Sequence, residues 1–325
     1  MQFAGPTTGT DATSEGASDA DADSAAANAP SESTLAAETQ VHLARPKDDE
    51  LDMFGLTHIG RVRQENQDHF LLATVHPQLV LYGTSLPDAR SLLTPGQRLA
   101  SILLVADGVG GSAAGSEASR LATEAVMRYV TSTLRCYHSV GSADDREFMA
   151  ALRAAAIDAH ETVRNEASGR LDGREMATTL SLGIVVWPWL YVLQVGDSRC
   201  YFYQNGKLRQ VTRDQTVAQE LVDRGVLTPE RAYSSPLNHV LSSAIGASEA
   251  MPVVTRVDVE QRGSVILVCS DGLTKHVTDS EIAEHLAGMT SAEQVCNALL
   301  ALTLERGGSD NVTMIVARAL PQKAA

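Results

Sequence analysis

Four aspartates in this chain stand where an apolar run ends or inside a tight, glycine-rich turn. They are Asp68, Asp107, Asp271 and Asp310. Asp107, for example, follows the apolar run 101–106 and precedes Gly-Val-Gly-Gly. Carboxylates aimed at one point repel each other unless cations neutralise them, and oxygen-rich sites of this kind suit Mg²⁺ or Mn²⁺. The pattern therefore favours a hydrolase in which two metal ions activate water.

Each of these aspartates, taken alone, has a simpler explanation. Asp and Gly dominate turns for local reasons, so an Asp-Gly pair after a strand is usually only a turn. Four such positions in one chain favour a shared metal site. Gly108, Gly110 and Ala113 also match a relaxed dinucleotide-binding fingerprint. The charge of Asp107 would oppose a pyrophosphate there, and the acid expected about 20 residues later at a strand end is missing.

The N-terminal segment differs in composition from the rest of the chain. Residues 1–40 contain seven acidic residues, no Lys or Arg, and one aromatic residue, Phe3. Such a segment cannot bury enough apolar surface to offset the entropy lost on ordering. It also lacks the basic start and apolar stretch of a secretory signal. We therefore predict a disordered tail over residues 1–48 and one folded domain over residues 49–320.

Composition also excludes several classes of function. The net charge is −14 and no basic run is interleaved with aromatic residues, so nucleic acid is not an expected partner. No apolar stretch reaches the about 18 residues of a membrane span. The four cysteines are isolated, which favours reduced thiols and a cytoplasmic protein. None of the nine histidines has a metal-ligand spacing, which argues against zinc.

Apolar periodicity predicts the elements that must position the aspartates. The expected strands are 54–59, 68–75, 101–106, 179–186, 190–195, 200–204, 208–210, 253–259, 264–270 and 311–317. The expected helices are 116–134, 146–167, 216–225, 279–287 and 292–306. We predict that 54–59 pairs with 68–75, that 253–259 pairs with 264–270, and that Asn205-Gly206 closes a hairpin. A long loop is expected at 76–98. Many short strands and grouped helices predict an α+β domain with antiparallel sheets covered by helices.

Six motifs in chain order resemble the PPM family, the metal-dependent Ser/Thr protein phosphatases of the 2C type, in its bacterial branch. They are Gly-Leu-Thr-His-Ile-Gly-Arg-Val-Arg-Gln-Glu-Asn-Gln-Asp (55–68), Val-Ala-Asp-Gly-Val-Gly-Gly (105–111), Met-Ala-Thr-Thr-Leu (176–180), Val-Gly-Asp-Ser-Arg (195–199), Cys-Ser-Asp-Gly-Leu (269–273) and Gly-Ser-Asp-Asn-Val-Thr (308–313). The resemblance covers about residues 52–318. It implies an antiparallel β-sandwich flanked on both sides by helices, α-β-β-α, with two Mn²⁺ or Mg²⁺ ions at one edge.

The resemblance also implies a role for each candidate metal ligand. Asp107 would bridge the two metals, and Asp271 and Asp310 would complete the ligands of the first. The Gly108 carbonyl and Asp68 would serve the second metal.

Two further residues receive roles from the resemblance. Asp197 resembles the ligand of a third, weaker metal shared with Asp271, although a plain turn is the alternative. Arg63 resembles the arginine that holds the phosphate, because a guanidinium can bind two phosphate oxygens at once. Arg61 is the alternative, and the spacing to Asn66 and Asp68 favours Arg63.

Several neighbours of these residues have two interpretations. Asn66, Asn311 and Thr178 are either turn and strand residues or partners that orient a carboxylate. Ser234 lies in segment 213–238, which resembles a mobile flap beside the metal site and would influence substrate choice.

The chain departs from the family pattern at three places. Val109 stands where some members carry a histidine proposed as general acid, which leaves the proton for the leaving group to water. Gln67 stands where many members have Glu, so Asp68 acts directly or through water. Asp214-Gln215 replaces a common Asp-His pair.

The resemblance implies an enzyme that hydrolyses phosphoserine and phosphothreonine on proteins, opposes a Ser/Thr kinase and acts as a monomer. One alternative is a partner-switching phosphatase that acts on small anti-sigma-antagonist proteins. Another is an inactive module that only binds phosphoproteins, which the retained metal aspartates argue against.

Overall fold

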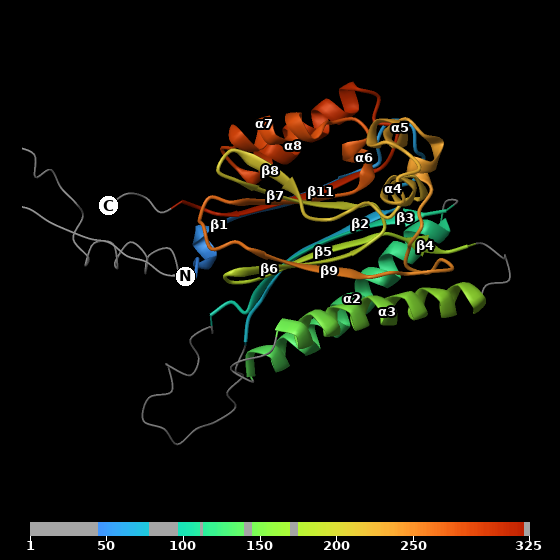
Figure 1. The fold of residues 1–325 in the computed structure, drawn as a ribbon. Coiled ribbons are helices and arrows are strands. Elements are labelled where there is room, and N and C mark those ends of the chain that lie inside the picture. Colours follow the sequence, from blue (N-terminus) through green and yellow to red (C-terminus); the bar gives the residue numbers. More distant parts are fainter. Residues whose placement is uncertain (1–44, 78–96, 111–112, 140–144, 170–174, 322–325) are drawn as a thin grey trace, which may run out of the picture. The chain divides into compact units, whose positions relative to one another are not determined.

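Two antiparallel β-sheets lie face to face, and helices cover the outer side of each sheet (Figure 1). The computed structural model describes residues 45–77, 97–110, 113–139, 145–169 and 175–321, which belong to one unit running from His42 to Ala325. The predicted tail lies outside the described residues except at its last positions, as does most of the predicted loop 76–98. The layering confirms the predicted fold class.

Each sheet has a fixed strand order. The sheet that contains β1, called the β1 sheet, has the order β1-β11-β10-β7-β8. Its strands are β1 (Leu51–His58), β7 (Arg199–Gln204), β8 (Lys207–Gln210), β10 (Val265–Cys269) and β11 (Val312–Ala319). The other, called the β2 sheet, has the order β2-β3-β5-β6-β9, with β4 paired to β3. Its strands are β2 (Asp68–Val75), β3 (Ala100–Val109), β4 (Ala177–Thr178), β5 (Leu180–Val186), β6 (Trp189–Val195) and β9 (Val253–Asp258).

Two helix pairs form the outer layers (Figure 1). α2 (Ala113–Ser139) and α3 (Asp145–Gly169) cover the β2 sheet, and α7 (Asp279–Ala287) and α8 (Ala292–Glu305) cover the β1 sheet. Among the helices that the structure describes, none combines the length and apolarity needed to cross a bilayer.

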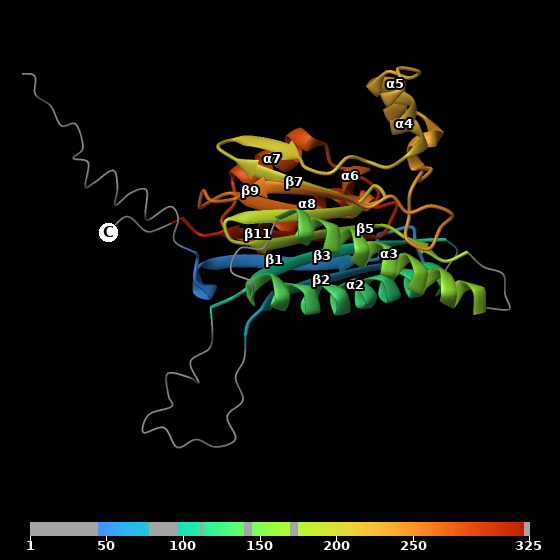
Figure 2. The same ribbon diagram turned by 60° about the horizontal axis from the view of Figure 1, so that its bottom comes forward.

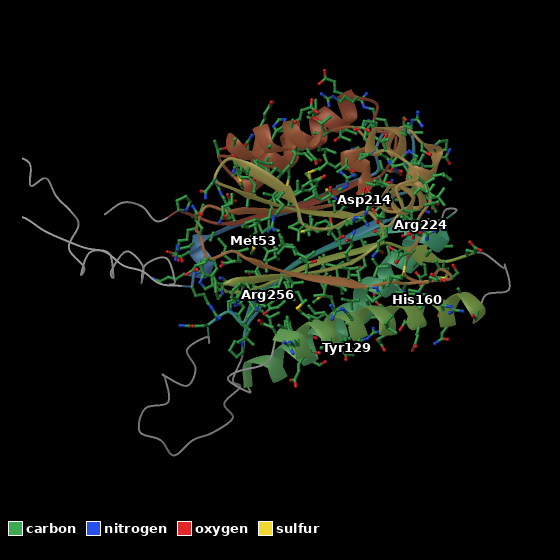
Figure 3. All side chains as sticks on the ribbon, viewed as in Figure 1. Met53, Tyr129, His160, Asp214, Arg224 and Arg256 are labelled. Atoms are coloured by element: carbon green, nitrogen blue, oxygen red, sulfur yellow. The ribbon has the colours of Figure 1, made fainter. Side chains whose placement is uncertain are left out.

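The side chains of β3 show why these layers form. Ile102 and Leu104 belong to the apolar cluster shared with α2 and α3, whereas Leu103 and Val105 belong to the cluster between the sheets. Successive strand side chains point to opposite faces, so a strand that is apolar on both faces must be covered on both. Figure 3 shows side chains filling the space between all four layers.

Shorter helical elements lie at the ends of strands or between them. They are η1 (Asp48–Glu50), α4 (Val217–Asp223), α5 (Pro229–Tyr233), η3 (Pro236–His239) and α6 (Asp271–Thr274). The side chains of Thr216 and Thr228 cap α4 and α5 by accepting hydrogen bonds from backbone N–H groups. α4, α5 and η3 pack on one another and stand away from the sheets in Figure 2. They form most of the segment predicted as a flap, residues 213–238.

Two of the three predicted pairings between sequence-adjacent strands are wrong. β1 pairs with β11 and β2 pairs with β3, so the arginine-rich segment between β1 and β2 crosses from one sheet to the other. β9 pairs with β6, whereas β10 pairs with β7 and β11. The predicted hairpin is confirmed, because β7 pairs with β8 and both Asn205 and Gly206 have positive φ, 51° and 75°.

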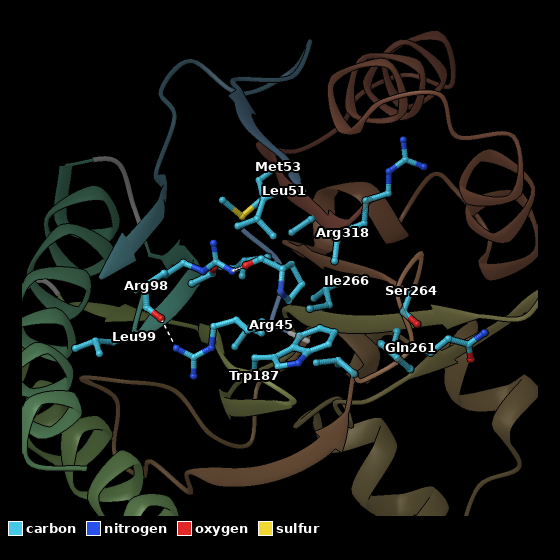
Figure 4. A pocket seen from close by; sticks show the side chains of 18 residues that line it. Arg45, Leu51, Met53, Arg98, Leu99, Trp187, Gln261, Ser264, Ile266 and Arg318 are labelled. Carbon is cyan, nitrogen blue, oxygen red and sulfur yellow. Dashed lines mark hydrogen bonds between the residues drawn. The ribbon is translucent and has the colours of Figure 1, made fainter. Parts of the chain in front are cut away.

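A cavity of about 50 Å³ lies between the sheets at the end where β3 begins (Figure 4). Its described lining includes Ser101 and Trp187 but no Asp, Glu, His or Cys. Arg45 reaches into it and donates a hydrogen bond to the Arg98 carbonyl at 2.6 Å. Because the lining of this cavity lacks carboxylates, it cannot supply the ligands that a hard divalent ion needs. The aspartates lie at the other end of β3, which finishes just after Asp107.

Candidate active site

The four aspartates predicted from the sequence lie at one edge of the sandwich and come from both sheets. Asp68 and Asp107 are opposite each other in the β2–β3 ladder. Asp271 is the first residue of α6, after β10, and Asp310 lies just before β11. Asp107, Asp271 and Asp310 line one cavity of about 190 Å³. The structure therefore brings together residues that are far apart in the chain.

Burial makes the carboxylates of the β2 sheet costly to ionise. Asp68 is only 4% exposed, and burial raises the pKa of its carboxyl group to about 6. Burial also raises the pKa of Asp107 well above its usual range, and the charges of Asp68 and Asp271 raise it further. Carboxylates in such surroundings are stable in the charged form only beside a compensating cation.

Among the described residues, two buried carboxylate oxygens have no hydrogen-bond partner, Asp68 Oδ1 and Asp271 Oδ1. Ser270 donates to the other oxygen of Asp68 at 2.8 Å, and Lys275 lies 2.6 Å from the other oxygen of Asp271. Buried polar atoms without a partner are rare in folded proteins. Carboxylate oxygens are the ligands that Mg²⁺ and Mn²⁺ prefer, so these two atoms fit the divalent ions expected from the sequence.

Two side-chain cations hold Asp310. The Arg63 guanidinium forms a fork with it, with Nε 2.7 Å from Oδ1 and Nη2 2.9 Å from Oδ2. Lys275 Nζ donates to Asp310 Oδ2 at 2.7 Å. Burial alone would raise the pKa of Asp310, but the hydrogen bonds from Arg63 and Lys275 outweigh it and lower that pKa.

The same ion pairs bear on whether the carboxylates can hold a metal ion. As the side chains stand, no three Asp, Glu, His or Cys residues in the described part of the chain are arranged to hold one metal ion. Both oxygens of Asp310 and one oxygen of Asp271 are occupied by Arg63 and Lys275. A divalent ion at this pair therefore requires Asp310 to exchange a partner.

Asp197 lies in the crossover from β6 to β7 and lines two cavities at this edge. Burial raises the pKa of Asp197 to about 8, and the charges of Asp271 and Asp214 act in the same direction, whereas Lys275 lowers it. Gln215 holds the turn, because its Oε1 accepts from the Gly196 N–H at 2.8 Å and its Nε2 donates to a carbonyl at 2.8 Å. The residue noted as a departure from the family pattern thus positions Asp197.

The backbone around Asp107 is fixed by close packing and by two threonines. A Cβ atom at Gly108 would lie 2.3 Å from the Gly115 carbonyl oxygen, so only glycine fits there. Thr178 Oγ1 donates to the Asp107 carbonyl at 2.8 Å, and Thr179 Oγ1 accepts from the Asp107 N–H at 3.1 Å. Thr178 therefore contacts the backbone of Asp107 and not its carboxylate.

Asn311 fixes the crossover that carries Arg63. Its Nδ2 donates to the carbonyls of Ile59 and Glu65, and its Oδ1 accepts from the Gln67 N–H, all at 2.9 Å. The side chain of Asn66 closes the same segment, because its Oδ1 accepts from the Asp68 N–H at 3.2 Å. The partners found for Asn311 are backbone groups, and Asn66 also donates to Thr57 Oγ1 at 2.8 Å, so neither orients a carboxylate directly.

Two adjoining cavities of about 590 and about 190 Å³ open above the carboxylates. Residues that line both are Arg63, Asp197, His239, Asp271, Lys275 and Asp310. Tyr233 and Asn238 of the flap line the larger one. Ser234 lines neither, and its hydroxyl donates to the carbonyls of Glu230 and Arg231 in its own helical turn. The structure therefore does not bring Ser234 to the site.

Three residues of these cavities were missed by the sequence reasoning. Lys275 stands four residues after Asp271, a spacing that places two helical side chains on one face and could have signalled the contact. Arg199 lines the larger cavity and pairs with Asp214, with Nη2 2.7 Å from Oδ2. His239 reaches the site at the end of η3, and no local sequence signal predicts this position.

Known proteins with this fold include Ser/Thr phosphatases. A family model described as protein phosphatase 2C matches residues 83–305. The Ser/Thr protein phosphatase PstP of Mycobacterium tuberculosis (strain CDC 1551 / Oshkosh) is 35% identical over 218 residues, which cover 67% of this chain and 40% of PstP. The Ser/Thr phosphatase stp of Listeria monocytogenes serovar 1/2a is 32% identical over 223 residues, which cover 68% of this chain and 86% of that protein.

A solved structure extends the comparison to three dimensions. The catalytic domain of PstP in complex with two manganese ions superimposes with a TM-score of 0.63 and 28% identity, over 83% of this chain and 99% of that one. The full-length PstP is longer, and this chain spans less than half of it.

Proposed function

Because this chain belongs to the protein phosphatase 2C family, we propose that it is a metal-dependent phosphatase that hydrolyses phosphoserine and phosphothreonine on proteins. One observation carries the proposal: buried carboxylates from two sheets converge beneath cavities that also hold a guanidinium. Two carboxylate oxygens there have no protein partner. The related PstP catalytic domain was solved with two manganese ions, which supports Mn²⁺ or Mg²⁺ as cofactor.

The assignment of ligands follows the positions around the cavity. The residues assigned to two divalent ions are Asp68, Asp107, Gly108, Asp271 and Asp310. Asp197, with Asp271, is assigned to a third. When bound, such ions lower the pKa of an attacking water and neutralise charge on the phosphoryl group.

We assign the substrate phosphate to Arg63. Its side chain is 51% exposed, lines both cavities and already holds a carboxylate in a two-point fork. Phosphate oxygens match the same two donors, so a substrate phosphate can replace Asp310 in the fork. Val109 carries no ionisable group, so it cannot supply the proton for the leaving oxygen.

The surface beside the cavities supports a protein substrate. The flap exposes large apolar side chains, among them Val226, Leu237 and Tyr233, which is 70% exposed. Grouped exposed apolar side chains next to a site indicate a contact surface for a protein. We propose that the substrates are products of a cognate Ser/Thr kinase in the cytoplasm, which the free thiols of Cys200, Cys269 and Cys296 support.

Turnover of p-nitrophenyl phosphate and of phosphoserine and phosphothreonine peptides, measured with Mn²⁺, Mg²⁺ or EDTA, tests the proposal. Asp107→Asn and Asp271→Asn should each lower kcat by at least about 100-fold, because each weakens the ions that generate the nucleophile. Asp158→Asn on the exposed side of α3 is the matched control and should keep its activity. Turnover that persists in EDTA, or in either site variant, would refute the assignment.

A further inference from the structure

Lys275 stands among the carboxylates of the site. It caps the C-terminal end of α6, four residues after Asp271. Its Nζ lies 2.6 Å from Asp271 Oδ2 and 2.7 Å from Asp310 Oδ2. The side chain is only 25% exposed and lines both cavities. One ammonium group thus bridges two carboxylates that are 39 positions apart in the sequence (310 − 271 = 39).

Three other charged side chains lie around Lys275 and the two carboxylates that it contacts. Arg63 faces Asp310 from the β1–β2 crossover, and Asp197 lies close enough to Lys275 for their charges to interact. Asp107 faces the same cavity from β3. Lys275 is therefore the cation shared by Asp271 and Asp310, whereas Arg63 contacts Asp310.

An exposed Asp-Lys pair one helical turn apart would have little consequence, because water screens it. The pair in this site differs in two respects. Both carboxylates are mostly buried, with 19% and 15% of the side chain exposed, so screening is weaker. The ammonium also takes an oxygen from each of two residues assigned to the first metal ion.

We propose that Lys275 is an internal cation that competes with the divalent metal for Asp271 and Asp310 and so sets the metal affinity of the site. The inference rests on the proposed function, because it needs a metal at this pair. To admit a divalent ion, Asp310 must release one of its donors, since Oδ1 accepts from Arg63 and the Asn311 N–H, and Oδ2 accepts from Arg63 and Lys275. The energy of the Lys275 contacts is then subtracted from the energy of metal binding.

Metal binding measured directly separates this role from an effect on catalysis. Calorimetric titration of EDTA-stripped, dialysed protein with Mn²⁺ should give a Kd about tenfold lower for Lys275→Met than for the wild type, because the competing charge is gone. Lys275→Arg keeps the charge and should bind Mn²⁺ with an affinity closer to that of the wild type. Lys207→Met, at an exposed position in the β7–β8 hairpin, removes the same charge away from the site and should change the Kd less than about twofold.

Thermal unfolding gives a second readout without turnover. The metal-free Lys275→Met protein should melt at a lower temperature than the wild type, because its carboxylates lose their cation, and Mn²⁺ should raise its Tm by more. Should Lys275→Met fail to fold by circular dichroism, Lys275→Gln gives the same test with a polar side chain.

The outcomes are distinct. An unchanged or higher Kd for Mn²⁺ in the Met and Gln variants would overturn the inference while leaving the proposed function intact. A higher KM for phosphopeptide with unchanged Mn²⁺ binding would assign Lys275 to the substrate and overturn it equally. If the wild-type protein binds no Mn²⁺, the proposed function itself fails.

Discussion

Replacing Asp107 with asparagine should flatten the pH dependence of stability in the metal-free protein. In the folded state, burial raises the pKa of Asp107 well above its usual range and that of Asp197 to about 8. In the unfolded chain both groups titrate near about 3.9. Between these values the folded state holds protons that the unfolded state has released. The stability that these two groups contribute is therefore largest at low pH and is lost as the pH rises towards their folded pKa.

The change of the unfolding free energy with pH depends on how many groups titrate differently in the folded and unfolded states. Each such carboxyl group contributes about 1.4 kcal/mol of stability per pH unit inside its window. Asp197 is inside its window from pH 6 to 7.5, so this group alone should cost the wild type about 2 kcal/mol, or roughly 4–8 °C in Tm, and Asp107, whose pKa burial raises in the same direction, should steepen the loss. Asp107→Asn removes one of the groups that cause this loss and should make it smaller.

Thermal unfolding in EDTA at a series of pH values measures both slopes. Asp158→Asn, exposed on α3, removes a carboxyl group away from the site and should keep the wild-type slope. Saturating Mn²⁺ should abolish the decline, because bound cations favour the ionised carboxylates. The reasoning fails if the metal-free wild-type Tm is flat or rises over this range, or if Asp107→Asn keeps the full slope.

Three further changes test the parts of the site separately. Arg63→Lys keeps the charge but loses the fork, so kcat/KM for a phosphopeptide should fall roughly 5- to 150-fold, equivalent to about 1–3 kcal/mol, whereas Arg61→Lys should change it little. Asn311→Ala removes three hydrogen bonds that hold the Arg63 crossover, and urea unfolding should show a loss of about 3 kcal/mol, at about 1 kcal/mol for each. Altering residues 234–238 of the flap should lower phosphopeptide turnover more than p-nitrophenyl phosphate turnover, since the small substrate meets only the metals and Arg63.

A different outcome in each experiment would contradict the corresponding prediction. Reversed effects of the two arginine variants would move the phosphate contact by two residues along the crossover. A loss below about 1 kcal/mol for Asn311→Ala would mean that other contacts hold the crossover. Equal losses on both substrates would show that the flap supports the metal site itself.

Local sequence patterns predicted most elements but not their partners. The strand expected at 68–75 is β2 to the residue, and the helix expected at 279–287 is α7. Such patterns reflect which faces of one element are buried, and this depends on nearby residues. Strand pairing depends on which layer a segment enters, and β1 and β2 show that neighbours in sequence can enter opposite layers.

For the candidate site, too, the sequence predicted some residues and missed others. The four aspartates could be predicted from the sequence, because an acidic residue at the end of an apolar run or in a glycine-rich turn is easy to recognise. Lys275 was missed because α6 is only four residues long and its start looks like a turn. His239 was missed because its approach depends on how the whole flap folds.

Each sheet supplies two of the four aspartates that the sequence first indicated, and this has a mechanical consequence. Asp68 and Asp107 move with one layer, Asp271 and Asp310 with the other, and the Ser270 hydroxyl bonds across the seam to Asp68 at 2.8 Å. Any sliding of one layer over the other therefore changes the distance between these two pairs of carboxylates. A cavity made by Ile266→Ala, in the core between the layers and beside the far cavity, should loosen metal binding from a distance. The packing between the sheets thus sets the distance between the two pairs of carboxylates.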